Sequence, residues 1–154
     1  MRIRPFRDAD TEAVVGLWRA CGLLRPWNDP YRDIDRKRAV QPELFLVGIG
    51  EDADPRGVTG PGGPVEGPVV ASAMAGYDGH RGWLYYLAVA PGRQRLGHGR
   101  ALVAHVERLL TARGCPKLSL QVRSGNASVI DFYRRLGYLQ DEAVGLGKRL
   151  IPDA

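Results

Sequence analysis

Apolar residues recur along this chain with two different periods, and each period predicts one kind of secondary structure. Spacings of three and four residues indicate a helix that starts after Asp8 or Asp10 and ends near Gly22. The same spacing predicts further helices over Tyr31–Val40, over Gly99–Arg113 and after a cap at Asn126. Short alternating or continuous apolar runs predict strands, which are Arg2–Phe6, Leu44–Ile49, Val69–Tyr77, Trp83–Val89, Lys117–Val122, Tyr138–Gln140 and Val144–Ile151.

The order of these elements indicates the fold class. One strand is followed by two helices, three strands, a helix, a strand, a helix and a closing hairpin of Tyr138–Gln140 with Val144–Ile151. This order predicts a mixed α/β (α+β) sheet with helices on both faces. A length of 154 residues predicts a single domain over 1–154. Gly, Pro and acidic residues dominate Gly50–Pro68, where we expect a long flexible connection between strands.

The composition argues against several classes of protein. Hydrophobic residues make up 44% of the chain and charged residues 25%, as in globular rather than disordered proteins. No apolar run approaches the ~20 residues that cross a bilayer, and no apolar signal segment follows Met1–Pro5. We therefore expect a cytoplasmic protein without a membrane partner. Neither Cys21 nor Cys115 has a second cysteine or a histidine at metal-ligand spacing, so no metal site is expected.

The run from Val89 to Arg100 is the most informative for function. It joins an apolar strand to an amphipathic helix, and Gly97 and Gly99 lie where that helix begins. A glycine-bearing turn at this point leaves backbone N–H groups free at the positive end of the helix dipole, which suits the phosphates of a ligand. Three arginines add positive charge around the turn. Taken alone, the turn is equally compatible with a strand-to-helix connection that binds nothing.

Two common phosphate-binding templates do not fit this turn. The P-loop requires Lys-Ser/Thr after its last glycine, whereas Gly99 is followed by Arg100 and Ala101. The dinucleotide fingerprint requires a third glycine, and position 102 is leucine.

A different template does fit. Gln94-x-x-Gly97-x-Gly99, led in by Val89-x-Pro91, resembles the Gln/Arg-x-x-Gly-x-Gly/Ala signature of the GNAT superfamily of acetyl-CoA-dependent N-acetyltransferases. The segment Asn126–Tyr138, with its apolar-Tyr pair and its Gly-aromatic end, resembles the second signature of that family. The resemblance covers nearly the whole chain. It is closest to the bacterial YpeA-like acetyltransferases and more distant to the RimI-like ribosomal-protein acetyltransferases.

The resemblance implies a GNAT fold with a mostly antiparallel sheet, and acetyl-CoA as cosubstrate. The pantetheine arm would lie along the backbone of Leu87, Ala88 and Val89, in a central strand that splays from its neighbour. The phosphates would bind the turn, and the corresponding residues are Gln94, Arg95, Leu96, Gly97, His98, Gly99 and Arg100. Asn126 would contact the pantetheine arm, although a plain helix cap explains it equally well.

Tyr133 is the candidate acid. A phenol has a pKa near 10, close to that of a thiol, so it can protonate a leaving thiolate at neutral pH. Its position in the second signature supports this role by resemblance. The alternative is a core tyrosine with one satisfied hydroxyl.

The base is less clear from the sequence. Many relatives carry a glutamate in the central strand, but Trp83–Val89 contains no acid. We expect an ordered water polarised by Tyr85 or Tyr86 to relay the proton, ahead of Asp78 or His80. The other acceptor-side candidates come from the first helices and a later turn, and they are Arg25, Trp27, Asn28, Asp29 and His80. Asp29 and Asp33 could attract a cationic amine, and Arg25 and Arg81 a carboxylate. A proline-stiffened, capped loop is the structural alternative for 25–30.

Together these features predict transfer of acetyl from acetyl-CoA to a primary amine by direct attack in a ternary complex. The acceptor is a small amine, an amino acid, or the N-terminus or a lysine of a protein. A non-catalytic acyl-CoA-binding regulatory module is the alternative. The net charge of +5 also fits a nucleic-acid-binding domain, but no block of five basic residues occurs, so nucleic acid is not the expected partner. A homodimer stays open.

Overall fold

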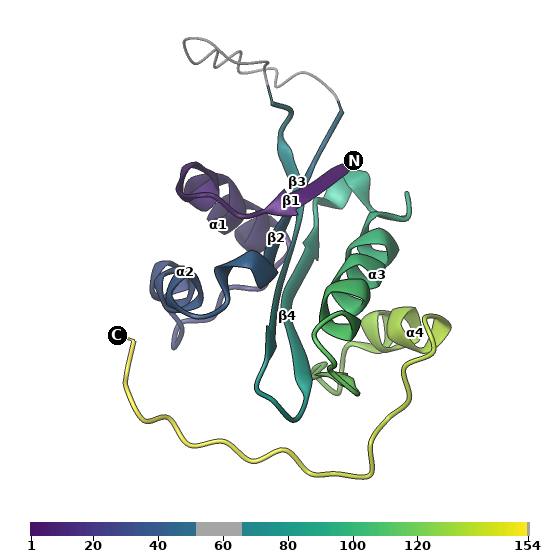
Figure 1. Ribbon diagram of the computed structural model, residues 1–154. Helices are drawn as coiled ribbons and strands as arrows, with labels where there is room; N and C mark the ends of the chain where they lie inside the picture. The colour runs from purple at the N-terminus through teal and green to yellow at the C-terminus, as the bar shows by residue number, and fades with distance from the viewer. Residues whose placement is uncertain (52–65, 154) are drawn as a thin grey trace.

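The computed structural model describes residues 1–51 and 66–153, and its strands form one five-stranded sheet (Figure 1). The spatial order follows the chain order, and the strands are β1 (Arg2–Pro5), β2 (Phe45–Ile49), β3 (Val69–Tyr77), β4 (Gly82–Val89) and β5 (Leu118–Leu120). The first four strands pair antiparallel, and β5 pairs parallel with β4. The predicted mixed, mostly antiparallel sheet is confirmed. Residues 52–65 of the expected flexible connection lie outside the described residues.

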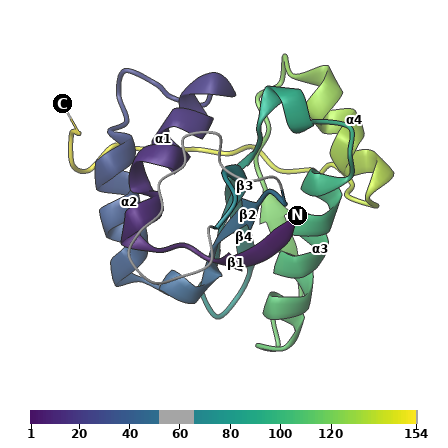
Figure 2. The ribbon, with the colours of Figure 1, turned by 90° about the horizontal axis from the view of Figure 1, so that it is seen from above.

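Helices cover both faces of this sheet, as Figure 2 shows from above. One face carries α1 (Thr11–Ala20) and α2 (Pro30–Ala39), and the other carries α3 (His98–Thr111) and α4 (Ala127–Arg135). Short 3-10 turns precede α1, β2 and α3, at η1 (Asp8–Asp10), η2 (Pro42–Leu44) and η3 (Pro91–Arg93). The sheet therefore separates two apolar cores, one centred on Trp18 and one on Leu102.

The apolar faces of the helices are those that the spacing predicts. Val14, Leu17 and Trp18 of α1 are buried against the sheet, whereas the polar α2 buries only Ile34. Asp29 caps α2 by accepting a hydrogen bond from the Tyr31 amide at 2.9 Å. The start of α2 is therefore fixed by one carboxylate.

The predicted starts of α1 and α4 are confirmed, but the side-chain capping is not. Asp10 and Asn126 occupy the N-cap positions of α1 and α4, but neither side chain accepts a capping hydrogen bond. The Asp10 carboxylate instead pairs with the Arg4 guanidinium at 2.7 and 2.9 Å, and it also accepts from the Arg7 amide at 2.8 Å. A buried arginine holds a carboxylate more strongly than a helix end does, because both partners are ionised.

The predicted closing hairpin is also wrong. After α4, residues 139–153 run as an extended tail without strand pairing, from α4 past the end of the sheet to α2 (Figure 1). Leu139, Val144 and Leu146 are each at least 88% exposed. A hairpin is stable only when it packs its apolar side chains on another element, and in the described residues these side chains are exposed. The tail is held by polar contacts at its end, above all by Asp153 with Arg36.

A buried ion cluster joins β1 to the segment before β3. Arg4 is only 8% exposed, and it donates to Asp10 and to both carboxylate oxygens of Glu66, at 2.8 and 2.9 Å. Arg2 also bonds Glu66. The hydrogen bond from Arg4 is the main reason why the pKa of Glu66 falls from 4.5 to about 2.

The shifted pKa predicts acid sensitivity. A carboxylate whose pKa is lower in the folded state stabilises the fold above pH 4.5 and loses this contribution as the pH falls toward 2. We expect Glu66→Gln to have a lower free energy of unfolding than the wild type at pH 6. At pH 3 we expect the difference in free energy between the two proteins to be smaller. Urea unfolding at both pH values measures this, with the exposed Glu142→Gln as control. An equal difference at both pH values would contradict the prediction.

Candidate active site

The sheet opens between β4 and β5. The two strands pair only where Gly82–Leu84 faces Leu118–Leu120, and none of the described residues pairs with the rest of β4 on that side. Ala90 donates to the Val70 oxygen of β3 at 2.8 Å, so the alternation of a strand directs the amides of Leu87 and Val89 toward the opening. The expected splay of the central strand is therefore present.

The carbonyl oxygen at the end of β4 already has two hydrogen-bond partners. The Val89 oxygen accepts a hydrogen bond from the Gln94 side-chain amide at 3.1 Å and from the Cys21 thiol at 3.2 Å. In this structure Gln94 thus fastens the turn to the end of β4. Among residues 1–51 and 66–153, no partner pairs with the amides of Leu87 and Val89, which face the opening.

A bulge in β4 turns two neighbouring tyrosines to one face. The register with β3 shifts between Ser72 and Met74, and Tyr86 has a φ of 49°. Leu84 packs into the core beneath α3, whereas Tyr86 packs with Trp18 on the α1 face. A positive φ is uncommon for a bulky residue, so its neighbours must hold it. The bulge lies where β4 leaves β5.

The turn before α3 has the open helix start that the sequence predicts. Gly97 is the N-cap residue with a φ of 82°, and no side chain caps the helix. The first helical bond runs from the Ala101 amide to the Gly97 oxygen at 3.0 Å, so the amides of residues 98–100 lie ahead of it. Anions bind such free amides at the positive end of the helix dipole.

Glycine is required at positions 97 and 99 of the turn for different physical reasons. Gly97 is needed for its positive φ, which an L side chain rarely adopts. A Cβ on Gly99 would lie 3.3 Å from the Phe132 ring and 3.7 Å from Val89. Gly99 therefore permits α4 and β4 to approach α3 closely, in addition to any approach of a ligand.

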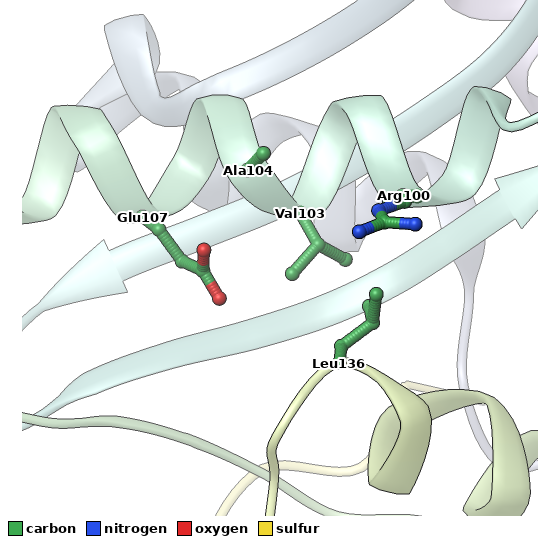
Figure 3. A pocket seen from close by; sticks show the side chains of 5 residues that line it. All are labelled: Arg100, Val103, Ala104, Glu107 and Leu136. Atoms are coloured by element: carbon green, nitrogen blue, oxygen red, sulfur yellow. The ribbon is translucent and has the colours of Figure 1, made fainter.

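A groove of about 200 Å³ lies between α3 and the end of α4. In Figure 3 the Arg100 and Glu107 side chains extend over it from α3, on either side of Val103, and Leu136 closes it from the other side. The Glu107 carboxylate also accepts a hydrogen bond from the Tyr138 hydroxyl at 2.7 Å. The groove thus has an apolar floor and one charge of each sign, with its cationic end at the start of α3.

Tyr133 of α4 lies in the apolar core that contains the buried residues of α3. Its ring packs edge-on to Phe132 and Tyr138, and only 7% of the residue is exposed. Burial raises its pKa to about 12, so the hydroxyl keeps its proton at neutral pH. Burial is the only cause of this shift, and no hydrogen bond of the hydroxyl to another described residue contributes to it.

On the opposite face, a polar cluster connects the bulge to α2 and the tail. The Tyr86 hydroxyl donates to the Asp33 carboxylate at 2.6 Å, and the Asn28 side-chain amide lies beside it. Asp33 accepts a second bond from Arg36 at 3.2 Å, and Arg36 in turn bonds Asp153.

Within 1–51 and 66–153, no three His, Cys, Asp or Glu side chains are grouped as metal ligands. In the same ranges, no helix is long and apolar enough to span a membrane.

An open edge on β4, an uncapped start of α3 and a tyrosine on α4 are features that the resemblance led us to expect. The family model described as Acetyltransferase (GNAT) family matches residues 12–138. The chain belongs to the GNAT acetyltransferase family. It is therefore an acyltransferase enzyme.

Curated relatives match this GNAT chain over nearly its whole length. It is 47% identical over 153 residues to Acetyltransferase YE1169 of Yersinia enterocolitica, covering 99% of this chain and 98% of that protein. It is 48% identical, with the same coverage, to Acetyltransferase ECA0875 of Pectobacterium atrosepticum. The fold is similar to that of the ribosomal-protein-S18-alanine N-acetyltransferase of Escherichia coli, with a TM-score of 0.66 and 24% identity, covering 88% of this chain and 76% of that one.

The GNAT fold brings together only part of the predicted acceptor side. Asn28, Asp29 and Tyr86 meet in the polar cluster. Arg25 bonds the backbone oxygens of Gly22 and Leu24 instead, and Trp27 is 52% exposed. These two residues are outside the cluster.

Two further predicted candidates lie outside the polar cluster, and two members of the cluster were not predicted. His80 belongs to an exposed turn closed by Asp78, and the half-exposed Tyr85 stacks on Trp83. Sequence reasoning missed Arg36 and Asp153. In the sequence, Arg36 is one of several charges on a polar helix and Asp153 lies near the end of the chain. No spacing rule pairs two residues that are 117 positions apart.

Proposed function

We propose that this GNAT protein transfers the acetyl group of acetyl-CoA to a primary amine by direct attack in a ternary complex. The observation that carries the proposal is the unpaired edge of β4 next to the uncapped start of α3. A strand edge adds an extended arm by main-chain hydrogen bonds, and free helix amides hold phosphates. The two features follow each other along the chain, as the pantetheine arm and the pyrophosphate do in the cosubstrate.

Each proposed binding residue has a defined task. The amides of Leu87 and Val89 bond the arm and polarise the thioester oxygen, with Ala88 between them on the strand. The amides of the turn and the exposed Arg95 and Arg100 hold the phosphates, together with the backbone of Leu96, His98 and Gly99. Asn126 is exposed just before α4, where its amide can contact the arm.

Tyr133 is the proposed acid that protonates the leaving thiolate. It is protonated at neutral pH, and no hydrogen bond of its hydroxyl to another described residue contributes to its raised pKa. The acceptor is an amine of one of two kinds, a small amine or amino acid, or a protein N-terminus or lysine. The similarity in fold to an S18-alanine N-acetyltransferase supports keeping a peptide N-terminus in the test.

Cosubstrate binding is expected to depend on Arg100. Loss of a charge-assisted hydrogen bond to a phosphate corresponds to about a tenfold to hundredfold weaker binding. We expect Arg100→Ala to raise the Kd for CoA by that factor and to reduce its salt dependence, as measured by titration calorimetry. Arg108→Ala, in the last turn of the same helix, is the matched control and is expected to bind CoA normally. Equal Kd values for the two variants would contradict the phosphate role of Arg100.

The function is tested by calorimetry with acetyl-CoA, followed by CoA release in the presence of single amines. The panel contains polyamines, amino acids, aminoglycosides, lysine peptides and peptides with a free N-terminus. Binding with release on one class of amine supports the proposal and identifies the acceptor. Binding without release on every amine favours the regulatory module, and absence of binding rejects the phosphate-binding turn.

A further inference from the structure

The mechanism lacks a proton acceptor in the usual strand. An amine that attacks a thioester must lose one proton, and β4 contributes no carboxylate of its own. A carboxylate nevertheless reaches β4 from outside the sheet. Asp33 of α2 accepts a hydrogen bond from the Tyr86 hydroxyl at 2.6 Å, at the bulge beside the opening between β4 and β5.

The fold keeps the Tyr86 hydroxyl in this place at some cost. The residue has a positive φ, its ring stacks on Trp18 with centroids 3.9 Å apart, and its backbone oxygen accepts from the Ser72 hydroxyl at 3.1 Å. Without the bulge, Tyr86 would face the same side as Leu84, toward α3. A strained backbone that persists at one position indicates a role for the side chain it presents.

We propose that Tyr86 and Asp33 form the proton relay of the acceptor side, an inference that rests on the proposed acetyl transfer. As the amine nitrogen bonds to the thioester carbon, it gives a proton to the Tyr86 oxygen, and the Tyr86 proton passes to Asp33. The carbon–sulfur bond then breaks, and Tyr133 protonates the departing thiolate. One proton leaves the amine and one joins the thiolate, so the transfer is balanced. Solvent returns the Asp33 proton to Tyr133 after the products leave.

The second oxygen of Asp33 has a separate task. It accepts from Arg36 at 3.2 Å, and Arg36 is held in turn by Asp153, whose side chain is 2% exposed and also accepts from the Asp29 amide at 3.0 Å. This arrangement leaves the first oxygen directed at Tyr86. Arg36 and Asp153 are therefore positioning residues, and the end of the tail completes the site.

The surroundings favour passing a proton over storing a charge on the phenol. Burial, and after it the Asp33 carboxylate, raise the pKa of Tyr86 above its usual range, so the ring stays neutral. Charged groups around the hydroxyl are Asp33 and Arg36 from α2, and Asp153 and Arg149 from the tail. The loop contributes the neutral Asn28, and α1 contributes the apolar Trp18.

The test compares Asp33→Asn, Tyr86→Phe and the double variant, with the best amine found for the wild type. We expect each single variant to lose about a hundredfold in kcat, as removal of a general base does, with an unchanged Kd for acetyl-CoA. The double variant is expected to be no slower than either single one, because the two groups act as a unit. Formate is expected to restore part of the activity of Asp33→Ala. Asp35→Asn, an exposed carboxylate of the same helix bound to Arg38, is the matched control and keeps full activity.

The outcomes separate the relay from the function. Unchanged kcat in Asp33→Asn, losses that multiply in the double variant, or a lack of rescue by formate in folded Asp33→Ala would overturn the relay alone. Circular dichroism of each variant establishes that it is folded. A wild type that releases CoA to no amine overturns the proposed function, and the relay with it.

The tail has a prediction of its own. We expect Asp153→Asn to lower kcat less than Asp33→Asn, and to raise amide exchange in α2 near Asp29, because Arg36 loses its clamp. Hydrogen exchange measured beside kcat detects both effects. Normal exchange with normal kcat would remove Asp153 and the tail from the site.

Discussion

Replacement of Tyr133 by Phe is expected to lower kcat by about 10²- to 10⁴-fold, the range found when a general acid or base is removed. The change deletes one oxygen and keeps the ring, so the packing against Phe132 and Tyr138 is retained. The Kd for acetyl-CoA is expected to stay nearly the same, because the hydroxyl would act on the leaving sulfur and not on the phosphates. Single-turnover CoA release and calorimetry on one preparation measure the two quantities.

The neighbouring tyrosine supplies the control for this experiment. Tyr138→Phe also removes a hydroxyl from the same aromatic cluster, but that hydroxyl is bound to Glu107 at the rim of the groove. We expect Tyr138→Phe to keep kcat close to that of the wild type. Full activity in Tyr133→Phe would exclude Tyr133 as the acid and leave the thiolate to be protonated by water.

Trp18→Ala is expected to lower the free energy of unfolding by about 3–5 kcal/mol, as large aromatic truncations in cores do. Trp18 is fully buried between Phe45 and Tyr86, and its indole N–H donates to the Ser72 hydroxyl at 2.9 Å. The substitution removes the stacking partner of the strained Tyr86 as well as apolar contacts. Urea unfolding at neutral pH gives the midpoint and slope that determine the free energy.

An exposed tryptophan provides the comparison. Trp27 is 52% exposed, and we expect Trp27→Ala to change the free energy of unfolding by no more than about 0.5 kcal/mol. A folded Trp18→Ala is further expected to lose activity out of proportion to its stability, because Tyr86 is no longer held. A small loss of stability in Trp18→Ala, similar to that in Trp27→Ala, would contradict the assigned packing.

The elements with strong periodicity were predictable. The bounds of β3 are those predicted, and β2, β4, α2 and α3 differ from the prediction by one or two residues at an end. The turn at Gly97 was predictable as well, because a helix start without a capping side chain is visible in the residue types themselves. The tail was not, since its alternation of Val144, Leu146 and Leu150 is that of a strand, yet nothing covers these side chains.

Several features of the site have no local signal. The bulge at Tyr86 arises from the register between β3 and β4, and Asp33 meets Tyr86 only because α2 packs on that face of the sheet. The sequence did identify Tyr86 and Asp33 as candidates, on chemistry alone. It could not join them across 53 residues, because periodicity describes faces of single elements and not contacts between elements.

By itself, the sequence determined the helices, most strands and the open helix start at Gly97, since short-range spacing and glycine chemistry encode these properties. Tyr133 was a candidate acid through the resemblance to the family signature. The tertiary structure alone decided where β4 separates from β5, which face the two tyrosines share, and that Arg36 pairs with Asp153 next to Asp33. These are contacts between distant segments. They depend on the packing of whole layers, which no single stretch of residues specifies.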